Sequence, residues 1–267
     1  WPLEPWADAD ARQEFHDRIV AWQIKALREA KRHTSWTDPD AGYEEGCREF
    51  VGRLLDPHVS GAFIWQMDAM VASIAPAAAV NSMAQVVLRL GLPGVPDLYQ
   101  GTELWDFSLV DPDNRRPVDF TLRQTLLQHE TPMHQQAAQW RTGGVKMHVI
   151  QRLLAFRARY PLMFSKGTYE PVEVSGPAER HVIAFLRRYD GSVLLVVVLR
   201  CVWGLVPSPR DLHLDAPVLG QTYLSLPVAK SGEWRSILHE NRAYQQTARL
   251  SLSFLQDGIP VECLVQV

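Results

Sequence analysis

The chain has 267 residues, a formal net charge of −3 and three cysteines. A chain of this length buries roughly three quarters of its unfolded surface, enough for one large domain or two of medium size. Acidic and basic residues are mixed along the sequence, so no basic stripe predicts a nucleic-acid partner. The cysteines are odd in number and widely spaced, which favours reduced thiols in a cytoplasmic protein over a disulfide framework or a zinc site.

The sequence contains no apolar run long enough to predict a membrane-spanning helix. Its longest apolar run, Val193 to Leu199, is far shorter than the ~20 residues that a membrane-spanning helix needs, so we expect no membrane partner. The chain begins at Trp1 rather than at a methionine, and we expect it to be a piece of a longer polypeptide. An N-terminal targeting signal cannot be read from a piece.

The first 92 residues read as helices. Apolar residues at helical spacing predict a first helix over about 11–32, with Asp8 or Asp10 as its cap. The basic cluster at the end of that helix is either a solvated helix end or lies near a substrate. His33 and Trp36 follow, and we expect them to fix a turn rather than to reach a cleft. A second helix ends at Asp56, before a proline.

A third helix is expected over about 63–74, and a fourth begins after Pro76 and ends at Gly91. Beyond residue 120, helices are predicted over 121–129 and 145–160. Between them, residues 131–144 are polar and rich in glutamine and predict a mobile loop.

From Gly167 the pattern changes to alternation and β-branched runs, which predict strands. The candidate strands are 168–170, 181–188, 193–202, 222–226, 236–238, 250–255 and 261–267. Asp190-Gly191 between two of them is a hairpin signal. Short strands without intervening helices predict an antiparallel β-sandwich. We therefore expect one domain over residues 1–165 and a second over 166–267.

Residues 93–120 carry the densest set of polar and aromatic side chains. A short apolar run, Val95 to Tyr99, lies between prolines and a glycine and predicts one brief buried strand. An irregular segment follows, rich in aspartate, arginine and aromatic residues. Barrel enzymes place functional groups in such loops, at the carboxyl end of a strand.

These residues resemble a known family. The stretches P-G-V-P-D-L-Y-Q-G-T-E-L-W and L-V-D-P-D-N-R-R-P-V-D-F, both within residues 93–120, look like the last barrel strand and following loop of maltooligosyl trehalose synthases. Two further blocks fit the same family and its order, residues 25–36 and 162–169. The resemblance spans nearly the whole chain but only the C-terminal part of the family's length. It places the chain in the α-amylase clan, glycoside hydrolase family 13.

The resemblance implies a fold class of α/β plus all-β: the C-terminal end of a (β/α)8 barrel, mostly helical here, followed by the antiparallel sandwich. In this clan the reactive carboxylates lie in motifs on middle barrel strands, and no such motif occurs in these residues. The resemblance therefore implies that this chain holds no catalytic residue. It would supply a wall of the sugar cleft and the β domain, with a maltooligosaccharide and the remainder of the parent catalytic domain as partners.

The residues themselves support the absence of a catalytic carboxylate. Asp111 and Asp113 are close enough in sequence to be considered as the pair that a retaining glycosidase needs. Arg115 and Arg116 lie beside them, and a guanidinium lowers the pKa of a neighbouring carboxyl, whereas a general acid needs a raised one. Scaffolding by ion pairs and binding of sugar hydroxyls remain equally open for the two aspartates. For the two arginines, internal pairing is the stronger alternative to binding.

The rest of the segment supplies further candidates. Tyr99 and Gln100 are expected to line a pocket, because binding roles gather at strand ends. Glu103 either faces the cleft or is a buried structural carboxylate, and Trp105 either stacks on a sugar ring or packs in the core. The full set of predicted substrate-binding residues is Asp97, Tyr99, Gln100, Glu103, Trp105, Asp111, Asp113, Arg115 and Arg116. No cofactor or metal is expected, because no phosphate loop, HExxH motif or Ca²⁺ loop appears.

The activity implied by the resemblance is isomerisation of the reducing-end α-1,4 bond of a maltooligosaccharide to an α,α-1,1 bond. The implied mechanism is double displacement with a glycosyl-enzyme intermediate, in which the released glucose attacks in place of water. Two alternatives stay open. One is another hydrolase or transglycosidase of the clan, and the other is a non-catalytic carbohydrate-binding or scaffold fragment.

Overall fold

The structure is a computed structural model, and it describes residues 1–3, 6, 8–128, 131–205, 212, 214, 217–227, 232–256 and 258–266. The chain forms two compact units. Unit 1 comprises Trp1–Ser73 and Asp106–Val118, and unit 2 comprises Ile74–Trp105 and Asp119–Val267. The polar segment predicted as the site is therefore divided between the two units, and each unit is described by itself.

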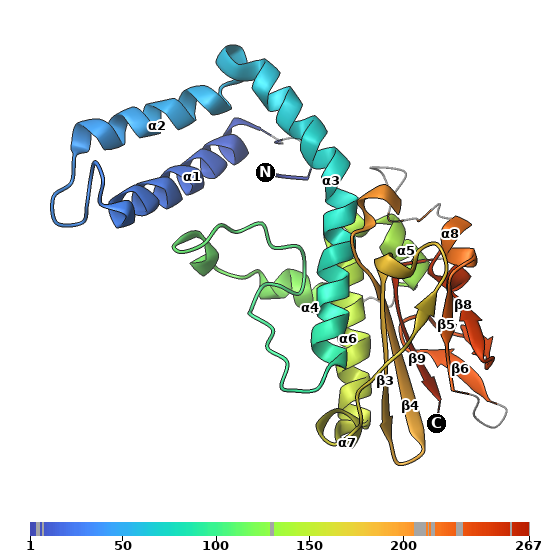
Figure 1. The fold of residues 1–267 in the computed structure, drawn as a ribbon. Coiled ribbons are helices and arrows are strands. Elements are labelled where there is room, and N and C mark those ends of the chain that lie inside the picture. The colour runs from blue at the N-terminus through green and yellow to red at the C-terminus, as the bar shows by residue number, and fades with distance from the viewer. Residues whose placement is uncertain are drawn as a thin grey trace. The chain divides into compact units, whose positions relative to one another are not determined.

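Unit 1 is built around a pair of helices, α1 (Ala9–Ala30) and α2 (Ala41–Leu55), which lie side by side (Figure 1). The side chain of Asp8 caps α1 by accepting from the Ala11 amide, and Asp40 caps α2 in the same way. One buried apolar cluster joins the helices, and its members are Val20, Ile24, Val51 and Leu55. The predicted first two helices and the Asp8 cap are thus confirmed.

A long helix, α3 (Pro57–Gly91), begins in unit 1 and ends in unit 2. The sequence predicts two helices separated at Pro76, and this is wrong. Pro76 is buried inside the helix, among alanines that favour helical structure and themselves pack in the core. Burial of this apolar face outweighs the roughly 3 kcal/mol that an interior proline costs. Within the described part of the chain, α3 alone has the length and hydropathy of a membrane-spanning helix, and 44% of that stretch is buried in the fold.

The remaining helices belong to unit 2, and they are α4 (Phe120–Gln128), α5 (Met133–Ala138), α6 (Gly144–Arg159), α7 (Pro161–Ser165) and the short α8 (Pro217–Gly220). α4 and α6 confirm the two predicted helices, although His129 at the end of the first lies outside the described residues. The mobile loop expected over 131–144 is wrong. That stretch forms α5 and a 3-10 turn, because Met133 and Trp140 bury their side chains in the core.

The strands of unit 2 pair in antiparallel fashion. Among the described residues they form one sheet in the order β1-β3-β4-β9-β6-β7 and a second in the order β2-β5-β8. Their bounds are β1 (Glu170–Pro171), β2 (Val174–Ser175), β3 (Val182–Tyr189), β4 (Ser192–Leu199), β5 (Tyr223–Ser225), β6 (Glu233–Ser236), β7 (Ala243–Gln245), β8 (Arg249–Ser251) and β9 (Val261–Gln266). The predicted antiparallel β structure is confirmed, and its closure as a sandwich stays a prediction.

The hairpin of β3 and β4 is the centre of the larger sheet. Asp190 and Gly191 both have positive φ angles, as the predicted two-residue turn requires. β4 is buried along nearly its whole length between β3 and β9. The C-terminal end of α3 packs against this hairpin at Gly91, where an added Cβ would lie 3.1 Å from Val196. Part of the predicted strand 250–255 is instead a 3-10 turn, Leu252–Leu255, whose first residues bond back to Ser251 and to Thr222.

The brief buried strand predicted over Val95 to Tyr99 is wrong in this structure. The segment is irregular, and Val95 is 99% exposed. A strand needs a neighbour to complete its main-chain hydrogen bonds, and no described strand pairs with these residues. The segment is instead anchored by arginines: Arg89 donates to the carbonyl of Asp97 at 2.8 Å, and Arg157 donates to that of Gly94 at 3.4 Å.

Candidate functional site

In unit 1, Asp113 is the centre of the predicted loop. It begins a 3-10 turn, η1 (Asp113–Arg115), and its side chain is buried. Arg18 on α1 binds both carboxylate oxygens, with Nε 2.8 Å from Oδ1 and Nη2 2.9 Å from Oδ2. The amide of Leu109 donates to Oδ2 at 2.7 Å. The bidentate contact between Arg18 and Asp113 fixes the loop 106–118 to α1.

The charges around Asp113 keep it ionised. Hydrogen bonds from Arg18 hold the pKa of the Asp113 carboxyl below its usual value, and the Leu109 amide and the charge of Arg116 act in the same direction against the effect of burial. Arg116 lies with its Nε 3.2 Å from the Asp113 carboxylate. Asp113 is therefore a structural anion, and the pairing expected for Arg116 is confirmed.

Asp111 makes a second, more accessible cluster. Lys25 lies with Nζ 2.9 Å from Oδ2 of Asp111 and 3.1 Å from its carbonyl oxygen, and Arg115 forms an ion pair with Oδ1. The Lys25 hydrogen bond, with the charge of Arg115, lowers the pKa of the Asp111 carboxyl. The basic end of α1 is thus used inside the fold, while the Arg115 side chain stays largely exposed.

A third cluster of charged side chains joins α1 to α2, and the sequence alone did not indicate it. Arg28 donates to both oxygens of Glu44, at 2.7 and 2.6 Å, and Thr34 donates to the same carboxylate at 2.6 Å. These hydrogen bonds, that of Arg28 first, lower the pKa of Glu44 to about 2. The Arg28 guanidinium lies 5.0 Å from the ring centroid of Trp36, and the turn role expected for this segment stays a prediction.

In unit 2, Glu103 and Trp105 are also used internally. Arg123 on α4 binds Glu103 at 2.9 Å and donates to the carbonyl of Gly101 at 2.6 Å. The indole nitrogen of Trp105 donates to the carbonyl of Trp140 at 2.6 Å. These contacts fix the loop to α4 and to the 3-10 turn Trp140–Thr142, which agrees with the structural alternative for both residues.

The remaining candidates are the most accessible ones. Asp97 and Gln100 are exposed, and Tyr99 is 51% exposed. The main chain holds them in place, since Thr102 donates to the carbonyl of Tyr99 through its amide, at 3.1 Å, and through its hydroxyl, at 2.7 Å. Their side chains are therefore presented to solvent on a fixed backbone.

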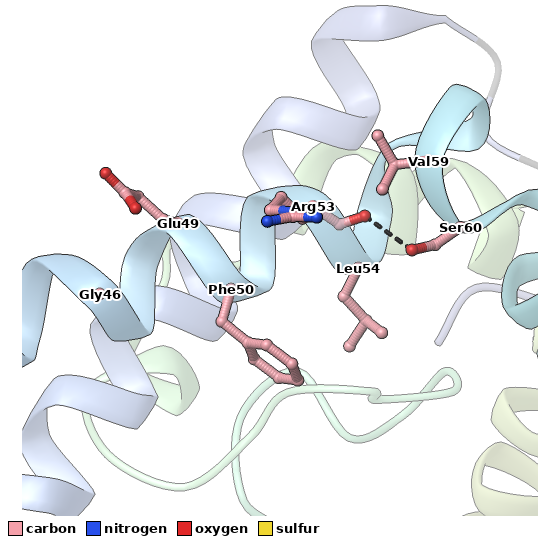
Figure 2. Close-up of a pocket in the computed structure, with 7 residues that line it drawn as sticks. All are labelled: Gly46, Glu49, Phe50, Arg53, Leu54, Val59 and Ser60. Atoms are coloured by element: carbon pink, nitrogen blue, oxygen red, sulfur yellow. Dashed lines mark hydrogen bonds between the residues drawn. The ribbon is translucent and has the colours of Figure 1, made fainter.

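In the described part of unit 1, two hollows lie apart from the predicted residues. Figure 2 shows a hollow of about 410 Å³ in unit 1, between α2 and the start of α3, where the hydroxyl of Ser60 donates to the carbonyl of Arg53. Its lining residues are Gly46, Glu49, Phe50, Arg53, Leu54, Val59 and Ser60. None of the predicted substrate-binding residues belongs to it. A second hollow, of about 270 Å³, lies between α1 and α2 and contains none of them either.

The arrangement is suited to holding a loop and to hydrogen bonding rather than to proton transfer. Every carboxyl group of the predicted set with an altered pKa has a lowered one, which keeps it charged and unable to act as a general acid near neutral pH. In the described part of the chain, no group of three histidine, cysteine or acidic side chains is placed to hold a metal ion. All three cysteines are free thiols.

Sequence and structure comparisons identify relatives. No protein-family model matches the chain. A protein of Mycobacterium tuberculosis named putative maltooligosyl trehalose synthase is 37% identical over the whole chain. The solved maltooligosyltrehalose synthase of Arthrobacter ramosus is 30% identical, with a TM-score of 0.72 over 98% of the chain and 31% of the solved chain. Another solved maltooligosyl trehalose synthase, 23% identical, has a TM-score of 0.68 and shows the same fold.

The match covers only part of each relative. The chain spans about 30% of the length of the curated relatives it matches, and that part is C-terminal. Because the similarity extends through both units at an identity well above chance, it reports common descent rather than a shared motif. Throughout its length, this chain is a relative of the maltooligosyl trehalose synthases and corresponds to their C-terminal portion.

Proposed function

We propose that the chain is the C-terminal part of a maltooligosyl trehalose synthase. The whole protein would convert the reducing-end α-1,4 bond of a maltooligosaccharide to an α,α-1,1 bond, and it would work in the cytoplasm. The observation that carries this proposal is the 37% identity to the mycobacterial protein over the entire chain. The stretch from Leu109 to Asp119, which resembles the family most specifically, supports the proposal as well. Ion pairs of Asp113 with Arg18 and of Asp111 with Lys25 hold this stretch in a defined position.

In this proposal the reactive carboxylates come from a part of the protein that precedes these residues. The electrostatics of the loop support that division. Arg18 and Lys25 lower the pKa values of Asp113 and Asp111, whereas the acid of a glycosidase needs a raised pKa. The isolated chain is then inactive, and it contributes shape and binding groups.

We further propose that residues 1–165 complete a (β/α)8 barrel with helical insertions and that residues 166–267 form the β domain. Exposed apolar side chains in unit 1 support this, because Phe50 and Trp65 are 61% and 71% exposed and Met70 is 56% exposed. Large apolar side chains that are exposed to solvent are typical of a face that another part of the protein covers.

Substrate binding would fall first to Asp97, Tyr99 and Gln100, whose side chains are exposed on a fixed backbone. An aromatic ring beside polar groups suits a pyranose, which has an apolar face and hydroxyls at its edge. The clustered residues, Glu103, Trp105, Asp111, Asp113, Arg115 and Arg116, would position this edge of the cleft, and Arg115 retains an accessible guanidinium for hydroxyl groups.

Product analysis tests the proposal. The intact protein is incubated with maltopentaose, and the products are separated by chromatography and identified by NMR. A trehalose-ended pentasaccharide is expected, because the released glucose and not water attacks the intermediate. Shorter maltodextrins and free glucose alone would instead assign a hydrolase of the clan. The 267-residue chain is assayed in parallel, and any trehalose-ended product from it would contradict the proposed location of the carboxylates.

A further inference from the structure

A small hollow in unit 2 lies apart from the residues discussed so far. Its volume is about 130 Å³, and α5, α6 and the turn after β6 contribute to its lining. The titratable side chains that line it are His134, His148, Arg152, His239, Glu240 and Arg242. Among the described residues that line it, Glu240 is the one carboxylate, and it lies at the exposed rim.

His239 is held by a buried carboxylate. The ring is 8% exposed, and its Nδ1 lies 3.1 Å from Oε2 of Glu262, which is itself buried. Glu262 also accepts from the hydroxyl of Ser236 at 2.8 Å and from the Cys263 amide at 2.9 Å. Because the carboxylate is an acceptor, the hydrogen on the imidazole belongs on Nδ1. The orientation of the ring is therefore fixed, with Nε2 on the opposite side.

That opposite nitrogen is buried and has no hydrogen-bond partner among the described residues. It belongs to a side chain that lines the hollow. At Gly258, which also lines the hollow, an added Cβ would lie 2.7 Å from Nε2 of His239 and 3.4 Å from Nη1 of Arg242. The imidazole and the guanidinium thus face the same small space. Buried polar atoms in native proteins nearly always have partners, so an unpartnered one facing a hollow indicates a ligand.

On the other side of the hollow, a carboxylate of the protein itself, that of Glu240, already pairs with an arginine. Arg152 on α6 forms an ion pair with Glu240, and its Nε donates to Nε2 of His148 at 3.3 Å. The His148 ring therefore carries its own hydrogen on Nδ1. Burial, with the charge of Arg152, lowers the pKa of His148, so this ring stays neutral at neutral pH. The Glu240 side chain is 61% exposed, so solvent reaches this carboxylate at the rim.

We propose that this hollow binds a tetrahedral oxyanion, a phosphate group that carries a hydroxyl. The phosphate replaces Glu240 on Arg152, accepts a hydrogen bond from Arg242 and donates one from its hydroxyl to Nε2 of His239. With the anion bound, Nδ1–H of His239 still donates to Glu262, and Nε2 accepts a hydrogen bond from a hydroxyl group of the phosphate. A guanidinium fork suits two phosphate oxygens. The ligand is either inorganic phosphate or the phosphate end of a small ester, and the site is independent of the proposed sugar chemistry.

Calorimetric titration of the intact protein tests the site, with inorganic phosphate and glycerol 3-phosphate as charged probes and glucose as the uncharged one. Saturable binding of at least one phosphate probe is expected. Tighter binding of inorganic phosphate would assign the free ion, and tighter binding of glycerol 3-phosphate would assign an ester. The absence of binding by both phosphate probes would overturn the proposal, and so would glucose binding in their place.

Two substitutions locate the bound anion. Glu240→Gln removes the competing carboxylate at the exposed rim, and it should raise phosphate affinity about threefold, the size of a partly exposed ion pair. Gly258→Ala places a methyl group against His239 and Arg242 while keeping the His239–Glu262 pair, and it should lower the affinity about tenfold or more.

The matched control is Arg235→Ala, which removes an exposed guanidinium from β6, the strand leading into the same turn, and should leave the affinity within a factor of about two. A thermal melt of each variant confirms that it is folded. Phosphate binding that neither Glu240→Gln nor Gly258→Ala changes would place the anion elsewhere and overturn the proposal. Because Glu240→Gln predicts a gain, loss of folding cannot produce the expected result.

Discussion

In each unit of the molecule a buried charged residue fixes a long segment, and the two residues, Asp113 and Arg187, have different kinds of partner. In unit 1, Asp113 is held by the guanidinium groups of Arg18 and Arg116. In unit 2, Arg187 is 1% exposed and has no carboxylate partner among the described residues. It donates instead to main-chain carbonyl oxygens at 2.6 to 3.1 Å, those of Gly91, Met163, Phe164, Gly167 and Thr168.

The difference determines what each anchor depends on. The Asp113 cluster depends on the charge of a carboxylate, so it is sensitive to acid. The Arg187 anchor depends on carbonyl groups, which do not titrate, and on a guanidinium that stays charged under all ordinary conditions. Arg187 lies on β3, and its hydrogen bonds hold the C-terminal end of α3, α7 and the residues just before β1 against this strand. We therefore expect unit 1 to lose its loop under conditions in which the core of unit 2 is unaffected.

The largest effect is expected from Arg187→Met. The substitution removes a donor from five buried or partly buried carbonyl groups, which should lower the free energy of unfolding of unit 2 by roughly 3 to 5 kcal/mol. Urea unfolding followed by circular dichroism measures it. Arg188→Met is the matched control on the next residue, where a partly exposed pair with Glu170 should contribute about 1 kcal/mol or less. Similar losses in both variants would remove the distinction between the two anchors.

Arg18→Met should have the next largest effect, confined to unit 1. It leaves the buried Asp113 carboxylate with weaker partners, at a cost of roughly 2 to 4 kcal/mol. Hydrogen exchange should show lost protection at the Leu109 amide, which donates to the same carboxylate. Removing both charges, Arg18→Met with Asp113→Asn, should recover part of the loss. Arg32→Met, an exposed residue just beyond α1, serves as the control, and an equal loss there would contradict the ion-pair account.

These two anchors also show what one sequence can reveal. The pairing of Arg115 with Asp111 and of Arg116 with Asp113 was foreseeable, because the partners are three or four residues apart. Arg18 lies 95 residues from Asp113, and nothing in its own surroundings distinguishes it from other helix-surface arginines. The positions of Glu44 and Arg187 as buried charges were missed for the same reason. Local pairs follow from spacing, whereas long-range pairs follow from the fold.

The fold itself was predictable where the pattern is strong. Helical periodicity located α1, α2 and α6, and Asp190-Gly191 located the β3–β4 hairpin. The errors arose where tertiary contacts override local preference. Pro76 continues a helix because its neighbours are buried, and residues 131–144 are ordered by the burial of Trp140. Val95 to Tyr99 has strand propensity but no described strand beside it.

A smaller effect, specific to unit 1, should appear on acidification. Arg28 lowers the pKa of Glu44 from its ordinary 4.5 to about 2. A carboxyl with a lowered pKa stabilises the fold fully above its unfolded value, and this stability is lost as the pH falls from about 4.5 toward about 2. The lowered pKa values of Asp111 and Asp113 act in the same direction.

Hydrogen exchange measured across this pH range should show unit 1 opening first, with α6, β3 and β4 still protected. Glu44→Gln should be less stable at neutral pH and should lose less stability on acidification than the unchanged chain. If the variant keeps the full acid dependence, Glu44 is not its source. If the strands of unit 2 open together with α1 and α2, the two anchors do not differ in the way proposed.

The smallest effect on stability is expected from a substitution of Tyr99, which takes part in neither the Asp113 nor the Arg187 contacts. Its half-exposed ring is expected to contribute little to folding, so Tyr99→Ala should change the free energy of unfolding by no more than about 0.5 kcal/mol. Tyr169→Ala is the matched control, because that similarly exposed ring packs against Phe185 at 5.1 Å and should cost about 1 kcal/mol. Under the proposed function, the order should reverse in the activity of the intact protein. Tyr99→Ala should lower kcat/KM for maltopentaose about tenfold, through the loss of one contact to a sugar ring, while Tyr169→Ala leaves it unchanged. Opposite orders of the two variants in stability and in kcat/KM would distinguish a residue that contacts the substrate from one that stabilises the fold. A Tyr99 variant with full activity would exclude this ring from the proposed cleft.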